Sequence, residues 1–498
     1  MSSYPRSLQY FLSRLSGWTS NQVRLQVAGS TTAQAGSIIE INIPSNTLVD
    51  LTSLAVHFDL VVASAGGHNV YVPRYMPQTM YRRVEWSING ITMSQSSNSY
   101  GLVWDTLATA TTPSDFQEFN MLNMGGKPSY SAPTANADHA LQPFPTYTSC
   151  NFIGFGAMKT WLNSSLVGSC RVRLTLNSND ILGQSGGTDA TYELRNLYAT
   201  VTVASLSDGL YNAALQEKLA RQEVLQMPFK SYFVFEQGNG SGGVASLKAT
   251  LSSSSVDRLY GVTRAHNYTD KTVATQQSCL AGGTTPYFQQ CGGGRHFVAA
   301  ANRPLQGLDA GFNTADLTHY QFMINSVVCP NYQVSCGSAW TGAGPTAPTV
   351  RHGGNAALEL RRSVGSLGDV DSGDGILFCQ YAQFPYNTVG ADGPCNVAGG
   401  GEAAESGAAQ GGGNGGAAPM AGQNMMQHIY KNYHCIVSYA TEYVGAESRT
   451  ISGLNMRGST GSLYFNATYS PNPCNQVLII ECTSILALSA NGAAELII

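Results

Sequence analysis

Two segments far apart in the chain have almost the same pattern. Tyr81–Met93 and His319–Pro330 are each a β-type run that reaches Ile-Asn-Gly or Ile-Asn-Ser and then resumes briefly. Each run then leads through a polar loop into a stretch with helical spacing. Ile88 and Ile324 are separated by about half of the 498 residues. A pattern that recurs at half the chain length predicts two similar domains in tandem. We expect its Asn-Gly or Asn-Ser turn to be structural and not a binding site.

The alternation of side chains predicts the fold class. Leu51–Val62 shows it most clearly, because its apolar residues fall on one face of a strand and its polar residues on the other. The apolar residues are Leu54, Val56, Phe58, Leu60 and Val62. Further strands are predicted at 21–28, 37–43, 170–177, 197–205, 229–236, 247–251, 256–262, 436–443, 462–468, 477–484 and 485–489, and short helices at 98–110 and 356–364. About eight short strands per half favour an all-β fold of two tandem antiparallel jelly-roll β-sandwiches, with short helices in the loops.

The same pattern divides the chain into segments. We expect an N-terminal arm at 1–19, a first jelly roll at 20–206, a connecting helix at 207–224 and a second jelly roll at 225–498. In the arm, the spacing of Leu8, Phe11 and Leu15 predicts a helix. This helix either packs on its own domain or docks on a neighbouring protein or a membrane surface. The Gly-rich segment 390–423 is too poor in apolar residues to order itself and is predicted to be an exposed loop.

Charged residues make up only 11% of the chain, whereas Tyr (25) outnumbers Phe and Trp together (17 and 5). Such a composition suits a protein that covers much of its surface with neighbours, and it equally suits a Gly-rich all-β protein without them. The net charge is −4, and no run of Lys or Arg is longer than a pair. We therefore expect no specific nucleic-acid binding.

Cysteine usage and hydropathy bear on where the protein works. The 11 Cys include no Cys-x-x-Cys pair, which favours reduced, buried thiols in a protein made inside a cell. The residues after Met1 lack the apolar core of a signal peptide, and no apolar run is long enough to predict a membrane span. The apolar stretch 477–498 is predicted to form strand, Asn491-Gly492 turn and strand.

No residue pattern predicts a catalytic, cofactor-binding or metal site, and we do not expect an enzyme. The nine His are scattered, and the 30 carboxylates form no persuasive acid/base pair. Gly125–Pro128 departs from a phosphate-binding loop at both ends, Gly292–His296 is predicted to be a plain loop, and Gly183–Gly187 lacks the helix that a nucleophile elbow requires. A hydrolase is not excluded on this ground, because β-sandwich hydrolases place their catalysts on distant loops.

Several segments together resemble a known family. Asn46–Ser53 leads into the long strand, Val84–Gly90 precedes a helix, Phe322–Tyr332 carries a polar turn followed by Pro-x-Tyr, and 451–488 supplies the closing strands. In this order they resemble the double jelly-roll major capsid proteins of icosahedral double-stranded DNA viruses, in the group of polinton-like viruses, virophages and large algal viruses. The resemblance covers about 20–498.

The resemblance implies a structural protein of the virion capsid shell, synthesised and assembled inside the host cell. Its partners would be two further copies in a homotrimer, neighbouring capsomers, and penton and minor capsid proteins. Six jelly rolls would form a pseudo-hexagonal capsomer, with the 390–423 loop outward and the 1–19 arm inward, against minor capsid proteins or an internal membrane. A spike or penton-type protein usually has one jelly roll, so the duplication argues against it. The alternative from another class is a secreted carbohydrate-binding or hydrolytic β-sandwich protein, which requires export and paired Cys.

Overall fold

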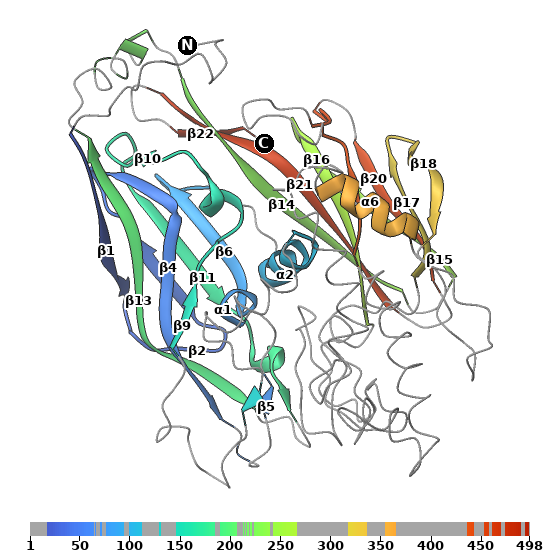
Figure 1. Ribbon diagram of the computed structural model, residues 1–498, viewed down its shortest axis with the longest axis horizontal. Coiled ribbons are helices and arrows are strands. Elements are labelled where there is room, and N and C mark those ends of the chain that lie inside the picture. The colour runs from blue at the N-terminus through green and yellow to red at the C-terminus, as the bar shows by residue number, and fades with distance from the viewer. Residues whose placement is uncertain are drawn as a thin grey trace, which may run out of the picture.

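The computed structural model places two β-sandwiches side by side (Figure 1). It describes residues 17–63, 65, 70–71, 76–93, 99–111, 129–130, 146–184, 190–206, scattered positions between 213 and 221, 224–239, 243–265, 317–335, 354–364, 436–442, 453–457, 461–469, 474–489 and 494–497.

The first sandwich has two antiparallel sheets. One has the order β1-β13-β4-β9 and the other the order β3-β11-β6-β7, and β1 pairs with both β13 and β3. The strands are β1 (Trp18–Ala28), β3 (Ile38–Asn42), β4 (Leu48–Ala63), β6 (Tyr81–Ile88), β7 (Ile91–Thr92), β9 (Thr146–Ser149), β11 (Cys170–Leu176) and β13 (Thr191–Leu206). Shorter strands at its margins are β2 (Ala33–Gln34), β5 (Val70–Tyr71), β8 (Ser129–Tyr130), β10 (Leu162–Asn163) and β12 (Gly183–Gln184).

The second sandwich repeats this arrangement. Its sheets have the orders β14-β21-β16-β19 and β15-β20-β17-β18, and β22 (Ala494–Ile497) pairs with β21. The strands are β14 (Leu225–Asn239), β15 (Gly243–Thr250), β16 (Val256–Ala265), β17 (Leu317–Ile324), β18 (Val327–Ser335), β19 (Ile436–Ala440), β20 (Ser462–Tyr469) and β21 (Cys474–Leu488). Since the eight strands follow each other along the chain in the same order in both sandwiches, the predicted double jelly roll is confirmed.

The alternation predicted for Leu51–Val62 explains how a strand such as β4 is held. Its predicted core residues are at most 1% exposed, whereas the intervening His57 and Asp59 are half-buried. Every second side chain thus enters the space between the two sheets, where burial of apolar surface stabilises the sandwich.

The duplicated Ile-Asn-Gly/Ser motif forms the same turn twice. Asn89 and Gly90 join β6 to β7, and Asn325 and Ser326 join β17 to β18, with positive φ at all four residues. Two successive residues with positive φ are the mark of a type I′ turn, whose twist matches that of a β-hairpin.

Short helices lie in the connections. They are α1 (Met76–Thr79), α2 (Tyr100–Thr111) and α6 (Gly354–Val364), with 3₁₀ turns η3 (Gly154–Ala157) and η4 (Asn179–Ile181). The helices predicted at 98–110 and 356–364 are therefore confirmed. Helical positions also occur between 213 and 221, within the segment expected to connect the two rolls. No helix among the described residues is long and apolar enough to cross a membrane.

Some boundaries differ from those expected. Residues 477–484 and 485–489 were predicted as two strands, yet β21 runs through without a break because Ser484 pairs across the sheet with Phe229 and bonds to buried Ser231. Strands β8 and β9 lie in a part of the chain for which no strand was predicted, and β1 begins at Trp18, inside the segment expected to be an arm. The predicted arm helix, the 390–423 loop and the Asn491-Gly492 turn lie outside the described residues.

Candidate assembly surfaces

The core of the first roll contains residues from both ends of the second half. Met227 and Phe229 at the start of β14, and Leu486 and Leu488 at the end of β21, belong to the same buried cluster as the first-roll core. The ring of Phe229 meets the ring of Phe155 in η3 edge to face, with centroids 5.0 Å apart. β14 and β21 therefore tie the two rolls together, as their long paths across Figure 1 show.

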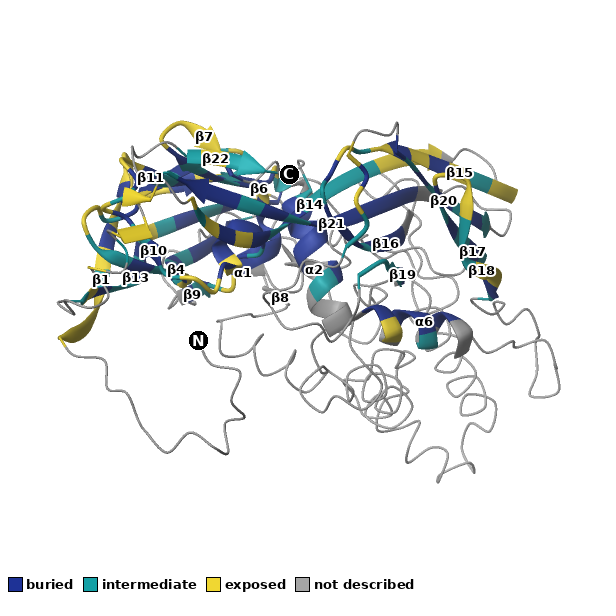
Figure 2. Cartoon of the chain, turned by 90° about the horizontal axis from the view of Figure 1, so that it is seen from above, coloured by how far each residue is buried: buried dark blue, intermediate teal, exposed yellow. Residues whose placement is uncertain are grey.

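Helix α2 provides the second tie. It lies between the two sandwiches in both views (Figures 1 and 2). Its Leu102 and Val103 are buried in one cluster with Tyr260 of β16 and Ile479 of β21. These strand residues point out of the second sandwich, away from its core, so the first roll covers the outward face of the sheet β14-β21-β16.

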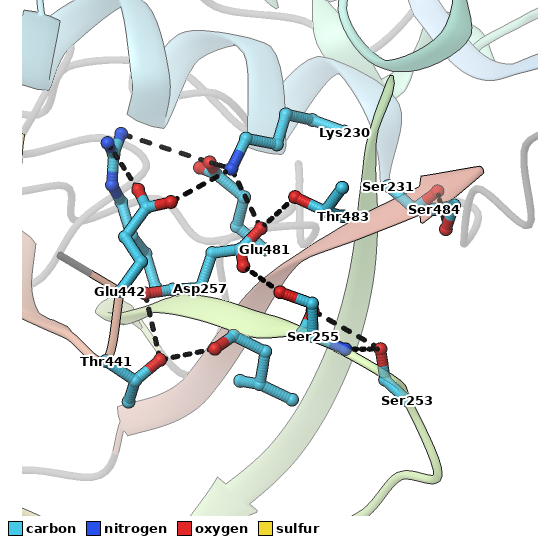
Figure 3. A network of polar contacts seen from close by, with 12 residues as sticks. Lys230, Ser231, Ser253, Ser255, Asp257, Thr441, Glu442, Glu481, Thr483 and Ser484 are labelled. Atoms are coloured by element: carbon cyan, nitrogen blue, oxygen red, sulfur yellow. Dashed lines mark hydrogen bonds and ion pairs between the residues drawn. The ribbon is translucent and has the colours of Figure 1, made fainter. Parts of the chain in front are cut away.

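A cluster of charged groups continues this covered face (Figure 3). Lys230 of β14 lies 2.8 Å from Asp257, 3.3 Å from Glu442 and 3.4 Å from Glu481. Arg258 lies 2.6 Å from Glu442 and 3.9 Å from Glu481. The side chains of Asp257 and Glu481 are only 1% and 3% exposed, so the cost of removing them from water has to be offset by these close cations.

A β-bulge brings Asp257 and Arg258 to the same side of the sheet. The pairing of β16 with β21 shifts between Val256 and Arg258, which leaves Asp257 as the extra residue. Neighbouring residues of a regular strand point to opposite faces, and a bulge removes that restriction. The Asp257 carboxylate then accepts hydrogen bonds from the hydroxyls of Ser255 and Thr483, both at 2.6 Å.

The ion pairs in this cluster stabilise the charged forms of its two cations. Burial acts to lower the pKa of Lys230, but the Glu481 and Asp257 carboxylates outweigh it and raise this pKa. The pKa of Arg258 is likewise raised, because Glu481, Tyr260 and Glu442 outweigh its desolvation. Each of the three carboxylates is engaged by a cation. A group held in this way is suited to fixing the position of strands.

Sequence reasoning did not find this cluster and named no site residue. Its members come from β14, β16, β21 and the residues after β19, so no local spacing connects them. Of the motifs set aside earlier, Gly183 and Gln184 pair with β5, and Gly125–Pro128 and Gly292–His296 lie outside the described residues. Among the described residues, no group of His, Cys, Asp and Glu could hold a metal ion. The described cysteines, Cys150, Cys170, Cys329 and Cys482, are free thiols.

The corresponding outward face of the first roll is more exposed. On β1, β13 and β4, His57 stacks on the ring of Tyr198 at 4.7 Å, and the Arg24 guanidinium lies 4.1 Å from the centroid of the same ring. Hydrogen bonds of 3.0 Å join the two His57 nitrogens to the hydroxyls of Thr148 and Thr200. Burial and the Arg24 charge lower the pKa of His57. Both effects favour the neutral form of the His57 imidazole in this stack.

The outward face of the other first-roll sheet is charged. Glu40 of β3 lies 3.4 Å from Arg171 and 3.0 Å from Arg173, and Arg83 of β6 lies 2.9 Å from Glu85. These pairs are partly exposed and contribute little to stability.

Comparison of the sequence with protein-family models found no match, and comparison with curated proteins found none either. Comparison with solved structures found viral major capsid proteins over nearly the whole chain. The PBCV-1 VP54 protein, fitted into a reconstruction of the virophage Sputnik, is similar with a TM-score of 0.52 at 12% identity, over 98% of this chain and 99% of VP54. The Faustovirus major capsid protein gives a TM-score of 0.52 at 9% identity, over 98% of this chain and 93% of its own.

A capsid model of PBCV-1 is similar to the same extent, with a TM-score of 0.50 at 12% identity over 98% of this chain and 99% of that one. The similarity spans both rolls of this chain. The chain therefore has the double jelly-roll fold of these viral capsid proteins, as the resemblance of its segments implied.

Proposed function

We propose that this chain is a major capsid protein, which assembles as homotrimers into the icosahedral shell of a double-stranded DNA virus. Each trimer would present six jelly rolls as a pseudo-hexagonal capsomer in the virion shell. Its contacts would be with neighbouring capsomers and with penton and minor capsid proteins, and its role would be structural and not enzymatic.

One observation carries the proposal: two rolls with the same strand order are fixed to each other by a shared core. A building block of a closed shell needs such fixed geometry, because a variable angle between its halves would prevent regular assembly. The viral capsid proteins that share the fold over their full length support this function.

Native mass spectrometry of the purified chain tests the proposal. We expect a species of three times the 52.8 kDa chain mass at micromolar concentration, and pseudo-hexagonal particles in negative-stain images. A folded chain that remains strictly monomeric under these conditions would contradict the proposal.

The arm provides a second test. The first strand, β1, starts at Trp18, which pairs with Leu206 at the end of β13, and the segment 1–16 precedes it in the sequence. Deleting residues 1–16 should leave the trimer intact and impair assembly of shells with minor capsid proteins or a membrane. Loss of the trimer itself would show that this segment has another role.

A further inference from the structure

The sheets β3-β11-β6 and β15-β20-β17 can be compared position by position, because the duplication aligns the chain with itself. Ile88 before the first turn pairs with Cys170 of β11, and Ile324 before the second turn pairs with Leu463 of β20. Counting from these two pairs, each outward residue of the first sheet has one counterpart on the second. Positions where the two sheets agree or differ can therefore be identified directly.

The middle outward row of these sheets is charged in the first roll and uncharged in the second. In the first roll, three directly opposed residues form it: Glu40, Arg173 and Glu85. Their counterparts in the second roll are Ser246, Asn466 and Gln321. The Ser246 hydroxyl donates to the Asn466 side-chain oxygen at 2.6 Å. Hydroxyl and amide groups both donate and accept hydrogen bonds, so the second row can face a group of either charge.

The two faces share an exposed aliphatic side chain at the same position. Ile38 of β3 is 63% exposed, and its counterpart, Val244 of β15, is 81% exposed. One exposed aliphatic residue is ordinary, but its recurrence at the same position of both rolls indicates that both faces become covered. In Figure 2, β11 and β7 lie along one margin of the molecule and β15 and β20 along another, both away from helix α2.

We propose that the outward face of β3-β11-β6 binds the outward face of β15-β20-β17 of a chain in a neighbouring trimer. Such a contact rests on the proposed function and identifies the surfaces by which one capsomer meets the next. First and second rolls alternate around the proposed capsomer, so any two opposite sides of it belong to different rolls. Two capsomers in the same orientation therefore bring a first-roll face against a second-roll face.

The charged row opposes a contact between two first-roll faces. In the proposed shell the strands of every capsomer point the same way, so two such faces can meet only about a two-fold axis parallel to the strands. The row then meets itself in reverse order: Arg173 faces Arg173, and Glu40 faces Glu85 of the other copy. Like charges are opposed on all three strands, which disfavours this arrangement. The uncharged row of the second roll has no such conflict, and the difference selects one orientation of neighbouring capsomers.

Disulfide trapping between trimers tests the proposal. Thr175 of β11 and its counterpart Thr468 of β20 are half-buried on the middle strands of the two faces, beside the charged and uncharged rows. Trimers of Thr175→Cys are mixed with trimers of Thr468→Cys and oxidised. We expect about tenfold more cross-linked chain pairs in the mixture than in either variant alone, which corresponds to a preference of about 1.4 kcal/mol. Cross-links as abundant in Thr175→Cys alone, or a mixture no more cross-linked than the unaltered chain, would overturn the proposal.

Exchange of the two rows tests the electrostatic selection. Ser246→Glu, Asn466→Arg and Gln321→Glu together give the second roll the charged row, which the same sheet already accommodates in the first roll. Added to both cysteine variants, this exchange should reduce cross-linking in the mixture by about tenfold, because like charges are now opposed in every pairing. Undiminished cross-linking would show that the charged row does not select the contact.

The reverse exchange is the matched control. Glu40→Ser, Arg173→Asn and Glu85→Gln together remove the charged row from the first roll. Cross-linking in the mixture should persist, and trimers of Thr175→Cys should now also cross-link with each other. If they remain as unreactive towards each other as before, like-charge repulsion is not what keeps the first-roll faces apart.

Mass photometry of every protein before oxidation separates this contact from the proposed function. If the unaltered chain forms trimers and the mixture does not cross-link, the proposed function stands and the contact is wrong. If the unaltered chain is a monomer, the proposed function itself fails. Native folding of each variant is checked by the protection of the buried Cys170 thiol.

Discussion

Asn89 and Asn325 occupy the same place in the two rolls and make the same contacts. The Asn89 backbone N–H donates to the Ser169 carbonyl, and its side-chain oxygen accepts from the Ser169 N–H at 3.0 Å. Asn325 has the same two bonds with Ser462, the side-chain bond being 3.2 Å. The motif that first suggested the duplication is therefore a turn that also fastens the neighbouring strand, β11 or β20.

The one difference between these turns leads to a prediction. Ser326 has φ +73°, where the first roll has Gly90 with φ +84°. Because positive φ strains a residue with a Cβ, Ser326→Gly should stabilise the second roll by about 1 kcal/mol. Gly90→Ser, the reverse exchange at the matching position, should destabilise the first roll by a similar amount. Urea unfolding monitored for each variant measures both, and a loss of stability in Ser326→Gly would contradict the explanation.

Lys230 should contribute far more to the stability of the fold than another lysine of the same roll does. Lys230→Met leaves the buried Asp257 and Glu481 with Arg258 as the remaining cation near Glu481, and breaking a buried pair from one side costs about 3 kcal/mol. Lys248→Met is the control, since Lys248 is exposed and lies over the Tyr464 ring at 5.7 Å, a contact of about 0.5 kcal/mol. Denaturant midpoints of the two variants should differ accordingly, and equal midpoints would show that the cluster does not stabilise the fold.

The two buried thiols lead to a prediction about how stability and thiol reactivity depend on pH. Burial raises the pKa of both Cys170 and Cys482 to about 12, from an ordinary value of 9.0. A group whose pKa is raised by folding stabilises the fold fully below its unfolded pKa, and this contribution is lost as the pH rises from about 9 towards 12. Both thiols should thus be inert to a disulfide reagent at pH 8 in the native protein and react after denaturation. Rapid reaction in the native state, or recovery of these residues as disulfides, would favour the exported β-sandwich alternative.

At the scale of elements, strands could be predicted from sequence where one face is buried and the other is not. The alternation in β4 and β11 directly reflects the space between two sheets. β21 is less regular because Val477, Leu478, Ile479 and Ile480 are all 0% exposed. Its inner face meets the second-roll core, and its outer face meets α2, so burial on both sides removes the period of two.

The charged cluster and the junction could not be predicted for a related reason. They depend on which strands are neighbours and on the bulge at Asp257. The spacing of residue types along the sequence indicates neither of these. The helix at 98–110 was predictable from its apolar spacing, but its contact with a strand nearly 380 residues later in the chain, Val477 and Ile479 in β21, was not.

Helix α2 should stabilise the contact between the rolls. Leu102→Ala removes a side chain that is 3% exposed and packed against the second roll, and we expect a loss of about 3 kcal/mol. Val224→Ala removes apolar atoms from a side chain that is 47% exposed and should cost less than about 0.5 kcal/mol. Differential scanning calorimetry of the two variants compares them directly. A Leu102→Ala protein as stable as Val224→Ala would show that α2 does not hold the rolls together.

At the scale of the whole molecule, the two rolls have no sheet in common, but residues of both halves form one buried core. The first-roll sheets end with β13, but the first-roll core also contains Phe229 and Leu486. A division of the chain at 207–224 therefore separates two sets of strands without separating two independent folding units. This coupling fixes the angle between the rolls, as the proposed capsomer would require.

The coupling predicts how fragments behave. A fragment of residues 1–224 lacks the second-half residues of its own core, Met227, Phe229, Leu486 and Leu488, and each missing large side chain leaves a cavity or exposed apolar surface. We expect this fragment alone to bind a hydrophobic dye and to unfold without a cooperative transition. As a control, the full chain carrying a protease site inserted after Leu206 and cleaved there keeps all core residues. It should retain one cooperative transition close to that of the intact chain. A fragment of 1–224 that unfolds as cooperatively as the cleaved protein would show that the rolls fold independently.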